Sequence, residues 1–559
     1  MSAAGIDLRH PYLTEQLIAY LGNKRALLPF LHDVFAHLEL KGSRTLFLDP
    51  FAGSGAVARL ARMMGFAVEA NDWEYYSFII NTCHLGTYAS ELAGLFADHG
   101  GLAGALAELN GLPSPSEDGA YISRHYAPRS TEKADWRTER LFYTRENGLI
   151  IDAVRERIEE MYPGTPEGTA FKEKAVLIAA LLYQAATHTN TSGVFKACHR
   201  GFGGHGRDAL GRIMKRIEVR APLVVDARWP AAASCMDAQE FLAGRSADIC
   251  YLDPPYAVHQ YGSNYFMLNT IARWDRPPVS EERGPDGRLR QKAGIRADWK
   301  RTRSAFCYRD TAAAALRGVV GAADCRWLVV SYSNEGLIGL EELCGILAET
   351  GSLSVVSTGY VKYPGGKQSL ERTTRNIELA LVVDRHVRPS ARTDMAAVLR
   401  PLRLARLMGG AFDPARVRAA FAVDGDAIIV ARPAGGAVRL PMRRFWRFHP
   451  DASPPCFPDA ADAERFLDTL SACALSDVRQ EIDVLSEIIR GNPAGPETGK
   501  LAREILRLAN KLAHRKNSGL FTEVLKGLRE IPVVEPELTR FHAGLDRIAQ
   551  TAVRRMPAP

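Results

Sequence analysis

The feature that most constrains the fold of this chain is a strand, a glycine turn, a helix and a second strand within residues 44–72. An apolar run that ends at Asp49 leads into the glycine turn and a helical pattern, and a second apolar run leads to Asp72. This order is typical of the opening of a doubly wound α/β sheet. We therefore predict an α/β fold on a Rossmann-like sheet.

The rest of the chain divides by its hydrophobic pattern. Three further apolar runs predict buried strands of the same sheet, at residues 248–252, 327–331 and 377–383. Between them lies a long stretch with apolar residues at helical spacing. After Asp384 the alternation of strands and helices stops, and a predicted β-hairpin over residues 427–440 precedes further helical patterns. We predict a core (1–81 and 230–384), a helical insertion (82–229) and a C-terminal domain, mixed and then helical (385–559).

Composition excludes several classes of protein. The chain has 559 residues, 46% of them hydrophobic, and a formal net charge of +7, which argues against a disordered chain and is compatible with a polyanionic partner. Its nine cysteines form no Cys-x-x-Cys pair, so we expect neither a disulfide framework nor a metal site. No secretory signal and no membrane-spanning apolar stretch is visible. We expect a cytoplasmic protein.

The glycine turn after the first strand is a candidate ligand site. Gly53 and Gly55 carry no Cβ, so the backbone can approach a ligand closely. The third glycine of a dinucleotide fingerprint is missing, and a tight turn without a ligand explains the glycines alone equally well. Asp72 favours the ligand, because an acid at the end of the following strand can accept hydrogen bonds from ribose hydroxyls.

Residues 253–256, Asp-Pro-Pro-Tyr, form the sharper motif. They follow an apolar run directly, at the carboxyl end of a predicted strand, where open α/β sheets bind their ligands. The two prolines fix the backbone and remove two N–H donors, which leaves a carboxylate, rigid carbonyl groups and an aromatic face. Such a loop suits the exocyclic amino group of a flat base, with Tyr256 stacked on the ring.

A third motif, residues 20–24 (Tyr-Leu-Gly-Asn-Lys), is typical, taken alone, of a helix start with a solvated lysine. In this order the three motifs resemble the alpha-class, Dam-like DNA adenine-N6 amino-methyltransferases, over about residues 20–384 of this chain. The close matches to the family's motifs are Tyr20, Gly22 and Lys24, then Asp49, Pro50, Phe51, Gly53 and Gly55, and then Asp253, Pro254, Pro255 and Tyr256. Looser matches are Asn71 with Asp72, Asp237, residues 329–334 and residues 371–376.

The resemblance implies S-adenosylmethionine as the cofactor. The residues that would bind it are Tyr20, Gly22, Lys24, Asp49, Phe51, Gly53, Gly55, Asp72 and Asp237. Among them Asp72 would hold the ribose, and Asp237 would accept from the adenine amine of the cofactor. The target adenine would be flipped out of the duplex. The catalytic motif would be Asp253, Pro254, Pro255 and Tyr256: Asp253 and the Pro254 carbonyl accept from N6, and Tyr256 stacks on the base. No metal is required, because positioning and electrostatics supply the effect.

The partner that the resemblance implies is double-stranded DNA, methylated at specific sites. The context would be a restriction-modification or defence system, with a restriction endonuclease as candidate partner, or a solitary methylase. Two alternatives stay open: an RNA adenine-N6 methyltransferase, because the motif recognises an amine and not the sugar, and a non-catalytic nucleic-acid-binding protein on the same scaffold. Measuring methyl incorporation and cofactor binding separates them.

Two basic stretches are candidates for holding the nucleic acid. Residues 196–220 and 288–303 each contain seven Lys or Arg residues, and both would flank the catalytic loop in the predicted fold. A solvated surface is the alternative interpretation of each stretch. We place the target-recognition region between residues 121 and 220.

Overall fold

The computed structural model describes residues 6–113, 120–204, 208–333, 336–361, 375–387, 395–431, 436–449, 452, 455, 457, 459–514, 517–533 and 536–555. The chain divides into two compact units, residues 1–358 with 378–393 and residues 359–377 with 394–559. Of the motif matches, Asn334 and residues 371–374 lie outside the described residues. No helix in the part of the chain that the structure describes is long and apolar enough to cross a bilayer.

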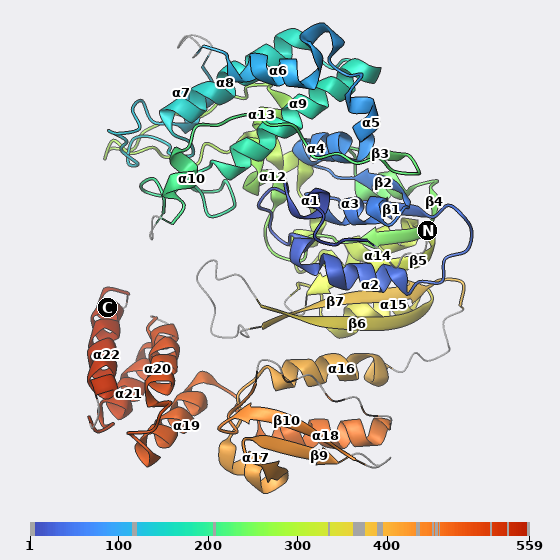
Figure 1. The fold of residues 1–559 in the computed structure, drawn as a ribbon. Coiled ribbons are helices and arrows are strands. Elements are labelled where there is room, and N and C mark those ends of the chain that lie inside the picture. The colour runs from blue at the N-terminus through green and yellow to red at the C-terminus, as the bar shows by residue number, and fades with distance from the viewer. Residues whose placement is uncertain are drawn as a thin grey trace. The chain divides into compact units, whose positions relative to one another are not determined.

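A seven-stranded sheet organises the first unit (Figure 1), in the order β3-β2-β1-β4-β5-β7-β6. The strands are β1 (Leu46–Asp49), β2 (Ala67–Asn71), β3 (Ala231–Ser234), β4 (Ser246–Leu252), β5 (Asp324–Ser333), β6 (Ser352–Val361) and β7 (Arg375–Asp384). β1 to β5 are parallel, whereas β7 pairs antiparallel with β5. The predicted Rossmann-like α/β sheet is confirmed.

The apolar runs of the sequence correspond to the inner strands, and the two strands without such a run are the edges of the sheet. β3 is Ala-Ala-Ala-Ser and is only partly buried. β6 begins Ser-Leu-Ser, with its apolar positions interrupted by polar ones. An edge strand is covered less than a central one, so it does not need a continuous apolar run. Sequence pattern alone therefore missed both.

Helices cover both faces of this sheet. On one face α1 (Pro11–Thr14), α2 (Leu28–Ala36) and α3 (Ala56–Met63) pack on Phe47, Val68 and other residues of alternate register. Leu48 and Leu252 point to the opposite face, because side chains alternate along a strand, and they are also buried. The helices α11 (Ala238–Leu242), α14 (Ala312–Ala322) and α15 (Leu340–Ala348) follow β3, β4 and β5. Burial on both faces explains why the inner strands are almost wholly apolar.

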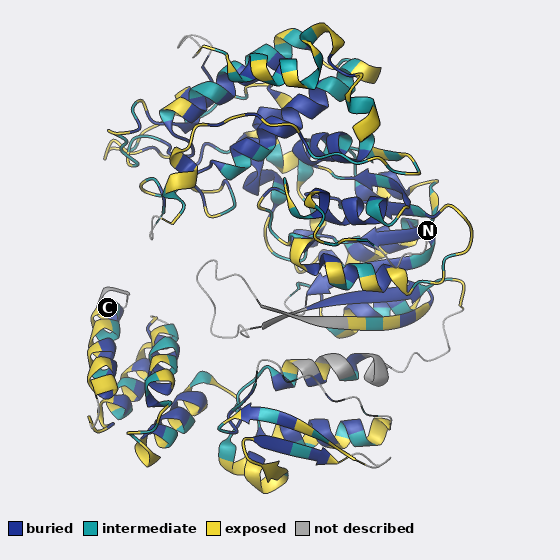
Figure 2. Ribbon diagram, in the orientation of Figure 1, coloured by how far each residue is buried: buried dark blue, intermediate teal, exposed yellow. Residues whose placement is uncertain are grey.

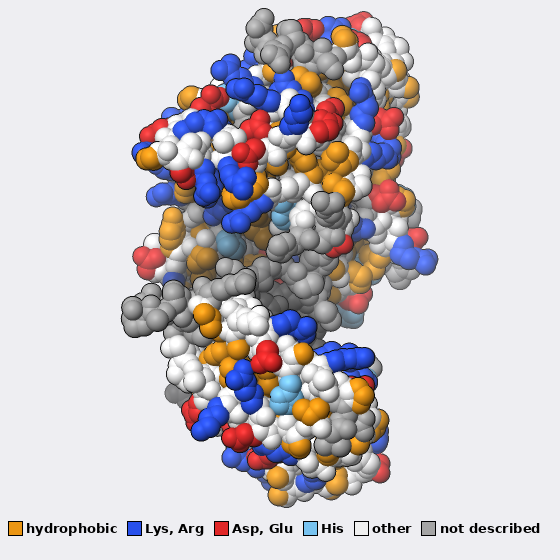
Figure 3. Space-filling model, turned by 90° about the vertical axis from the view of Figure 1, so that its left-hand side faces the viewer, with side chains coloured by type: hydrophobic (Ala, Val, Ile, Leu, Met, Phe, Trp, Pro, Cys, Tyr) orange, Lys and Arg blue, Asp and Glu red, His pale blue; other side chains and the backbone are white. Residues whose placement is uncertain are grey.

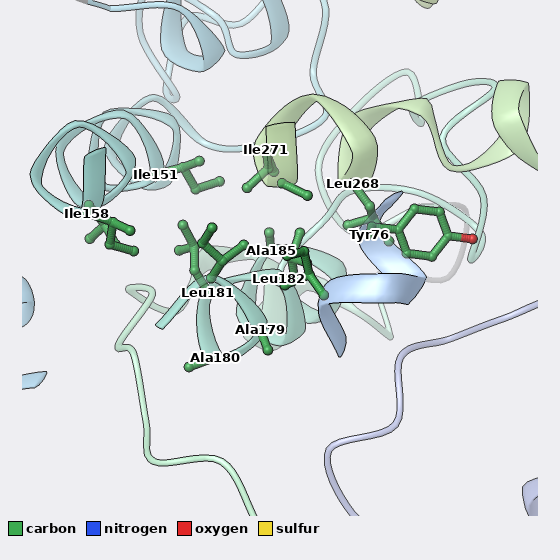
Figure 4. Close-up of a cluster of buried hydrophobic side chains, with 14 of the residues drawn as sticks. Tyr76, Ile151, Ile158, Ala179, Ala180, Leu181, Leu182, Ala185, Leu268 and Ile271 are labelled. Atoms are coloured by element: carbon green, nitrogen blue, oxygen red, sulfur yellow. The ribbon is translucent and has the colours of Figure 1, made fainter. Parts of the chain in front are cut away.

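A second core lies among the helices between β2 and β3. These helices are α4 (Tyr75–Gly86), α5 (Ala89–Leu92), α6 (Gly101–Asn110), α7 (Ile122–Tyr126), α8 (Arg145–Met161), α9 (Gly168–Thr187) and α10 (Leu210–Met214). Figure 4 shows side chains of α4, α8 and α9 meeting those of α13 (Phe266–Arg273), which follows the short helix α12 (Tyr261–Asn264). The segment after the Asp-Pro-Pro-Tyr loop thus shares a core with the predicted helical insertion, and this core supports one wall of the site below.

The second unit has its own sheet and helices. Its strands are β8 (Ala422–Asp424), β9 (Ala427–Ala431), β10 (Ala437–Arg443) and β11 (Arg447–Phe448), and its helices are α16 (Met395–Met408), α17 (Pro414–Ala420), α18 (Ala460–Cys473), α19 (Val478–Gly491), α20 (Thr498–Leu512), α21 (Ser518–Arg529) and α22 (Pro536–Arg555). β9 and β10 pair antiparallel, which confirms the predicted hairpin. In the described part, the helices of this unit alternate buried and exposed positions (Figure 2), as amphipathic helices do.

Candidate active site

One cavity at the carboxyl edge of the large sheet brings the three motifs together. Twelve of the thirteen residues predicted for the site line it: Tyr20, Gly22, Lys24, Asp49, Phe51, Gly53, Asp72, Asp237, Asp253, Pro254, Pro255 and Tyr256. The remaining residue, Gly55, is not among the lining residues. Segments that lie more than two hundred residues apart in the sequence therefore border the same space, as expected for ligands at the ends of parallel strands.

The glycine turn between β1 and α3 is held by side chains around it. Gly53 has φ +51°, and its N–H donates to Asp72 Oδ2 at 2.8 Å while its carbonyl accepts from Ser77 Oγ at 2.6 Å. A Cβ at Gly53 would lie 2.8 Å from the Tyr20 ring. Gly55, at φ +77°, is the N-cap of α3, and a Cβ there would lie 2.3 Å from Asn81 Oδ1. A side chain at either position would therefore clash, at Gly53 with the Tyr20 ring and at Gly55 with Asn81.

Two acids border the cavity at the ends of the neighbouring strands. Asp72 accepts from the N–H groups of Gly53 and Glu74, at 2.8 and 2.9 Å, and burial raises its pKa. Asp237 is the N-cap of α11, where its Oδ1 accepts from the Gln239 N–H at 2.8 Å. Because a carboxylate oxygen carries two lone pairs, both acids keep capacity to accept from a ligand hydroxyl or amine in the cavity.

The segment before the first strand is fixed by tyrosines that the sequence analysis did not identify. The Tyr20 ring stacks on the ring of Tyr265, with 4.9 Å between centroids. The Leu21 N–H donates to the Tyr265 hydroxyl at 2.7 Å, and the Tyr261 hydroxyl donates to the Leu21 carbonyl at 2.9 Å. The two tyrosines follow the Asp-Pro-Pro-Tyr loop at a spacing of four residues: Tyr261 begins α12, and Tyr265 lies between α12 and α13. That spacing places them together, but only the fold shows that they hold the segment containing Lys24.

Lys24 begins a short 3-10 helix (Lys24–Leu27), but it is not the solvated lysine that this position suggests by itself. Only 3% of its side chain is exposed, and Nζ lies 2.9 Å from Asp253 Oδ1 and 5.0 Å from the centroid of the Tyr256 ring. Burial alone would lower the pKa of Lys24, but the charges of Asp253 and its neighbours raise it well above its usual value. Lys24 is therefore a buried cation paired with the first residue of the Asp-Pro-Pro-Tyr motif.

The Asp-Pro-Pro-Tyr loop leaves the end of β4 and offers only hydrogen-bond acceptors and an aromatic ring to the cavity. Burial raises the pKa of Asp253, and the Lys24 ammonium opposes this rise and favours the carboxylate. Tyr256 packs edge-on against Tyr332, with 5.6 Å between centroids, and its carbonyl accepts from the Leu337 N–H at 3.1 Å. A rigid carboxylate beside an aromatic face can recognise a planar ring that carries an amino group.

Residues 302–306 also line the cavity, although no motif predicted them. Phe306 packs edge-on against Phe51, with 5.5 Å between centroids. Glu74 is 5% exposed; its Oε2 accepts from the Asn269 amide and its Oε1 from the Thr302 hydroxyl at 3.3 Å. Burial raises the pKa of Glu74 to about 7. The only sequence signal for residues 302–306 was their place at the end of the second basic stretch.

The two basic stretches meet at one tryptophan. The guanidinium groups of Arg200 and Arg288 lie 4.6 and 6.0 Å from the centroid of the Trp136 ring, and Arg137 lies 5.4 Å from it. Figure 3 shows one face of the first unit, on which Lys and Arg side chains gather among scattered acids. Arg296, in contrast, is 4% exposed and forms ion pairs with two aspartates, so this residue of the second stretch is structural.

Comparison with known proteins agrees with this geometry. The family model of the D12 class N6 adenine-specific DNA methyltransferases matches residues 20–286. The type II methyltransferase M.NlaIII of Neisseria lactamica is 30% identical over 62% of this chain and 93% of its own length. The modification methylase LlaI of Lactococcus lactis subsp. lactis is 28% identical over 65% of this chain and 54% of its own length. The type II methyltransferase M.CviAII of Paramecium bursaria Chlorella virus 1 is 27% identical over 62% and 92%.

Proposed function

Because the chain belongs to the family of D12 class N6 adenine-specific DNA methyltransferases, we propose that its cavity binds S-adenosylmethionine beside a flipped-out adenine of duplex DNA. The observation that carries the proposal is that the glycine turn and the Asp-Pro-Pro-Tyr loop border one cavity. A donor bound at the turn and a base bound at the loop would then share that space. Such an arrangement converts a two-substrate reaction into one between oriented neighbours.

The residues around the glycine turn fit this cofactor. S-adenosylmethionine supplies an activated methyl group when it is bound. Asp72 and Asp237 are acceptors at the ends of neighbouring strands, and they suit the ribose hydroxyls and the adenine amine of a nucleoside. Phe51 and the glycines shape the apolar part of the cavity. A Cβ at Gly22 would come within 3.3 Å of the Tyr256 hydroxyl, so side chains there would fill the space between the two motifs. Gly55 would support the turn through its packing and not through contact with the cofactor.

The Asp-Pro-Pro-Tyr loop would hold the target base. The Asp253 carboxylate and the Pro254 carbonyl would accept hydrogen bonds from the N6 amine, and Pro255 would keep the loop rigid. Tyr256 would stack on the ring of the flipped base. Lys24 would keep Asp253 ionised and fixed, because its ammonium stabilises the carboxylate against burial. These groups act through position and charge, and acceptors fixed before the reaction need no rearrangement during it.

The helical insertion would hold the DNA. We place phosphate contacts at the surface around Trp136, where arginines of both basic stretches converge, and target recognition between residues 121 and 220. The curated relatives are type II methyltransferases and modification methylases. We therefore propose that this enzyme protects specific sites within a restriction-modification system, with a restriction endonuclease as its partner in the pathway.

Transfer of labelled methyl groups from S-adenosylmethionine to duplex DNA tests this function. The expected product is N6-methyladenine in duplex DNA, with no label in a structured RNA of the same base composition. Label in the RNA alone would overturn DNA as the substrate. Absence of label in both, together with absence of S-adenosylmethionine binding by calorimetry, would overturn the enzymatic proposal and support a binding protein.

A further inference from the structure

The reversed strand of the sheet brings an additional acid to the site. β7 runs antiparallel to β5, and Glu378 pairs in register with Ser333 at the end of β5. Because β7 runs backwards, its beginning lies at the edge where the parallel strands end. Glu378 thereby reaches the same edge as the Asp-Pro-Pro-Tyr loop, where its Oε2 lies 3.9 Å from Lys24 Nζ. Glu378 is 5% exposed, an unusual state for an acid.

Lys24 is thus faced by two buried carboxylates. Its Nζ lies 2.9 Å from Asp253 and 3.9 Å from Glu378, while the face of Tyr256 covers it from another side. The charge of Asp253, and then those of Tyr256 and Glu378, favour the protonated form of Lys24 against the effect of burial. A buried ammonium that loses its only counter-ion carries a large desolvation cost. With two carboxylates beside it, the Lys24 ammonium stays paired with one of them when the other interacts with a ligand.

The proposed function requires that one of the two carboxylates, that of Asp253, interacts with the substrate. The Asp253 carboxylate would accept hydrogen bonds from the amino group of the target base. That group would gain positive charge as its nitrogen bonds to the methyl carbon and the carbon–sulfur bond of the donor breaks, until the nitrogen loses a proton. The electrostatic support that Asp253 gives to Lys24 then falls. We propose that Glu378 is a positioning residue that keeps Lys24 charged and in place while the Asp253 carboxylate accepts hydrogen bonds from the amino group of the base. This inference rests on the proposed methyl transfer. In it, Glu378 affects the reaction only by holding Lys24.

The test compares Glu378→Gln with wild type in the full-length protein, using labelled methyl transfer to duplex DNA under saturating substrates. We expect kcat to fall about tenfold or more, with the Kd for S-adenosylmethionine changed less than about threefold. Glu378→Asp keeps the charge at a longer distance and should recover part of kcat. Glu349→Gln, at an exposed acid paired with Arg317, is the matched control and should behave as wild type.

A double-mutant cycle separates positioning from a merely structural role. In a Lys24→Met background, Glu378→Gln should cause no further loss of kcat, because the residue through which it acts is gone. Equal losses in both backgrounds would overturn the inference, as would a Glu378→Gln enzyme with wild-type kcat. If Glu378→Gln does not fold, Glu378→Asp in the same two backgrounds gives the same comparison. A wild-type protein without methyl transfer would instead contradict the proposed function itself.

Discussion

The Nζ atom of Lys24 lies 2.9 Å from Oδ1 of Asp253, with both side chains largely buried at the edge of the sheet. This contact joins the segment before the first strand to the loop after β4, and the ammonium opposes the rise in pKa that burial causes in the acid that would face the substrate. An isolated buried carboxylate shifts toward its neutral form, whereas a neighbouring ammonium favours ionisation. The contact thus links the motif of residues 20–24 to the Asp-Pro-Pro-Tyr motif.

Gly53→Ala tests the steric requirement of the glycine turn. The substitution puts a Cβ 2.8 Å from Tyr20 at a positive φ, so we expect lower stability and weaker binding of S-adenosylmethionine. Gly65→Ala is the matched control, because Gly65 also has a positive φ, +81°, but open space around its Cβ position. Both variants should lose about 1 kcal/mol from backbone strain, and only Gly53→Ala should lose further stability and affinity. Thermal melts and calorimetry measure the two effects, and equal losses in both variants would contradict the assigned role of Gly53.

The surface around Trp136 should bind DNA through its arginines. For the double variant Arg200→Ala, Arg288→Ala we expect weaker binding of any duplex and a slope of log K against log salt reduced by about 2. Affinity for S-adenosylmethionine should not change, because neither residue lines the cavity. Arg317→Ala removes an exposed arginine of α14 as a control. Fluorescence anisotropy over a salt series provides the measurement; an unchanged slope would remove this surface from the DNA interface.

The raised pKa of Glu74 predicts a specific dependence of the free energy of unfolding on pH. Burial raises the pKa of Glu74 from 4.5 to about 7, so the folded state binds its proton more tightly than the unfolded state does. The resulting stabilisation is complete below about pH 4.5 and is lost as the pH rises through about 7. Glu74→Gln stays neutral throughout. From about pH 5 to about pH 8, the unfolding free energy of wild type should fall by about 2 to 3 kcal/mol relative to the variant. Denaturant titrations at the two pH values measure this difference, and a constant difference would refute it.

Truncation after Thr393 tests the division of the chain. The two buried cores of the first unit contain no residue beyond Val382, and those of the second unit begin at Leu404. Because the described cores share no residue, we expect the truncated protein to fold and to bind S-adenosylmethionine with an affinity within about threefold of the full chain. An insoluble product, or one that does not bind the cofactor, would show that the second unit completes the first.

Local features of the sequence were sufficient for the motifs and for most of the sheet. The glycine turn and the Asp-Pro-Pro-Tyr loop are contiguous, and each follows an apolar run that the structure shows as β1 or β4. Their meeting in one cavity follows from the general geometry of parallel sheets. The edge strands β3 and β6 were not predicted, because partly exposed strands lack a continuous apolar run.

The remaining features depend on contacts between distant residues. Lys24 looks solvated in its own segment, but it is buried and faces Asp253 and Glu378, both more than two hundred residues away in the sequence. Glu378 is the one acid in the apolar run of residues 377–383, a visible signal whose meaning depends on the direction of β7. The surface around Trp136 gave no local signal, since Arg200 and Arg288 come from segments distant in the sequence from Trp136 and Arg137.

The most direct test of the whole account is the adenine methylation of DNA from a methylation-free host that expresses this chain, mapped by sequencing. Wild type should place N6-methyladenine at one recurring sequence. Asp253→Ala should lower that signal about a hundredfold or more, while the purified variant binds S-adenosylmethionine as wild type does. Undiminished methylation by Asp253→Ala, or loss of cofactor binding without loss of methylation, would contradict the role given to the Asp-Pro-Pro-Tyr loop.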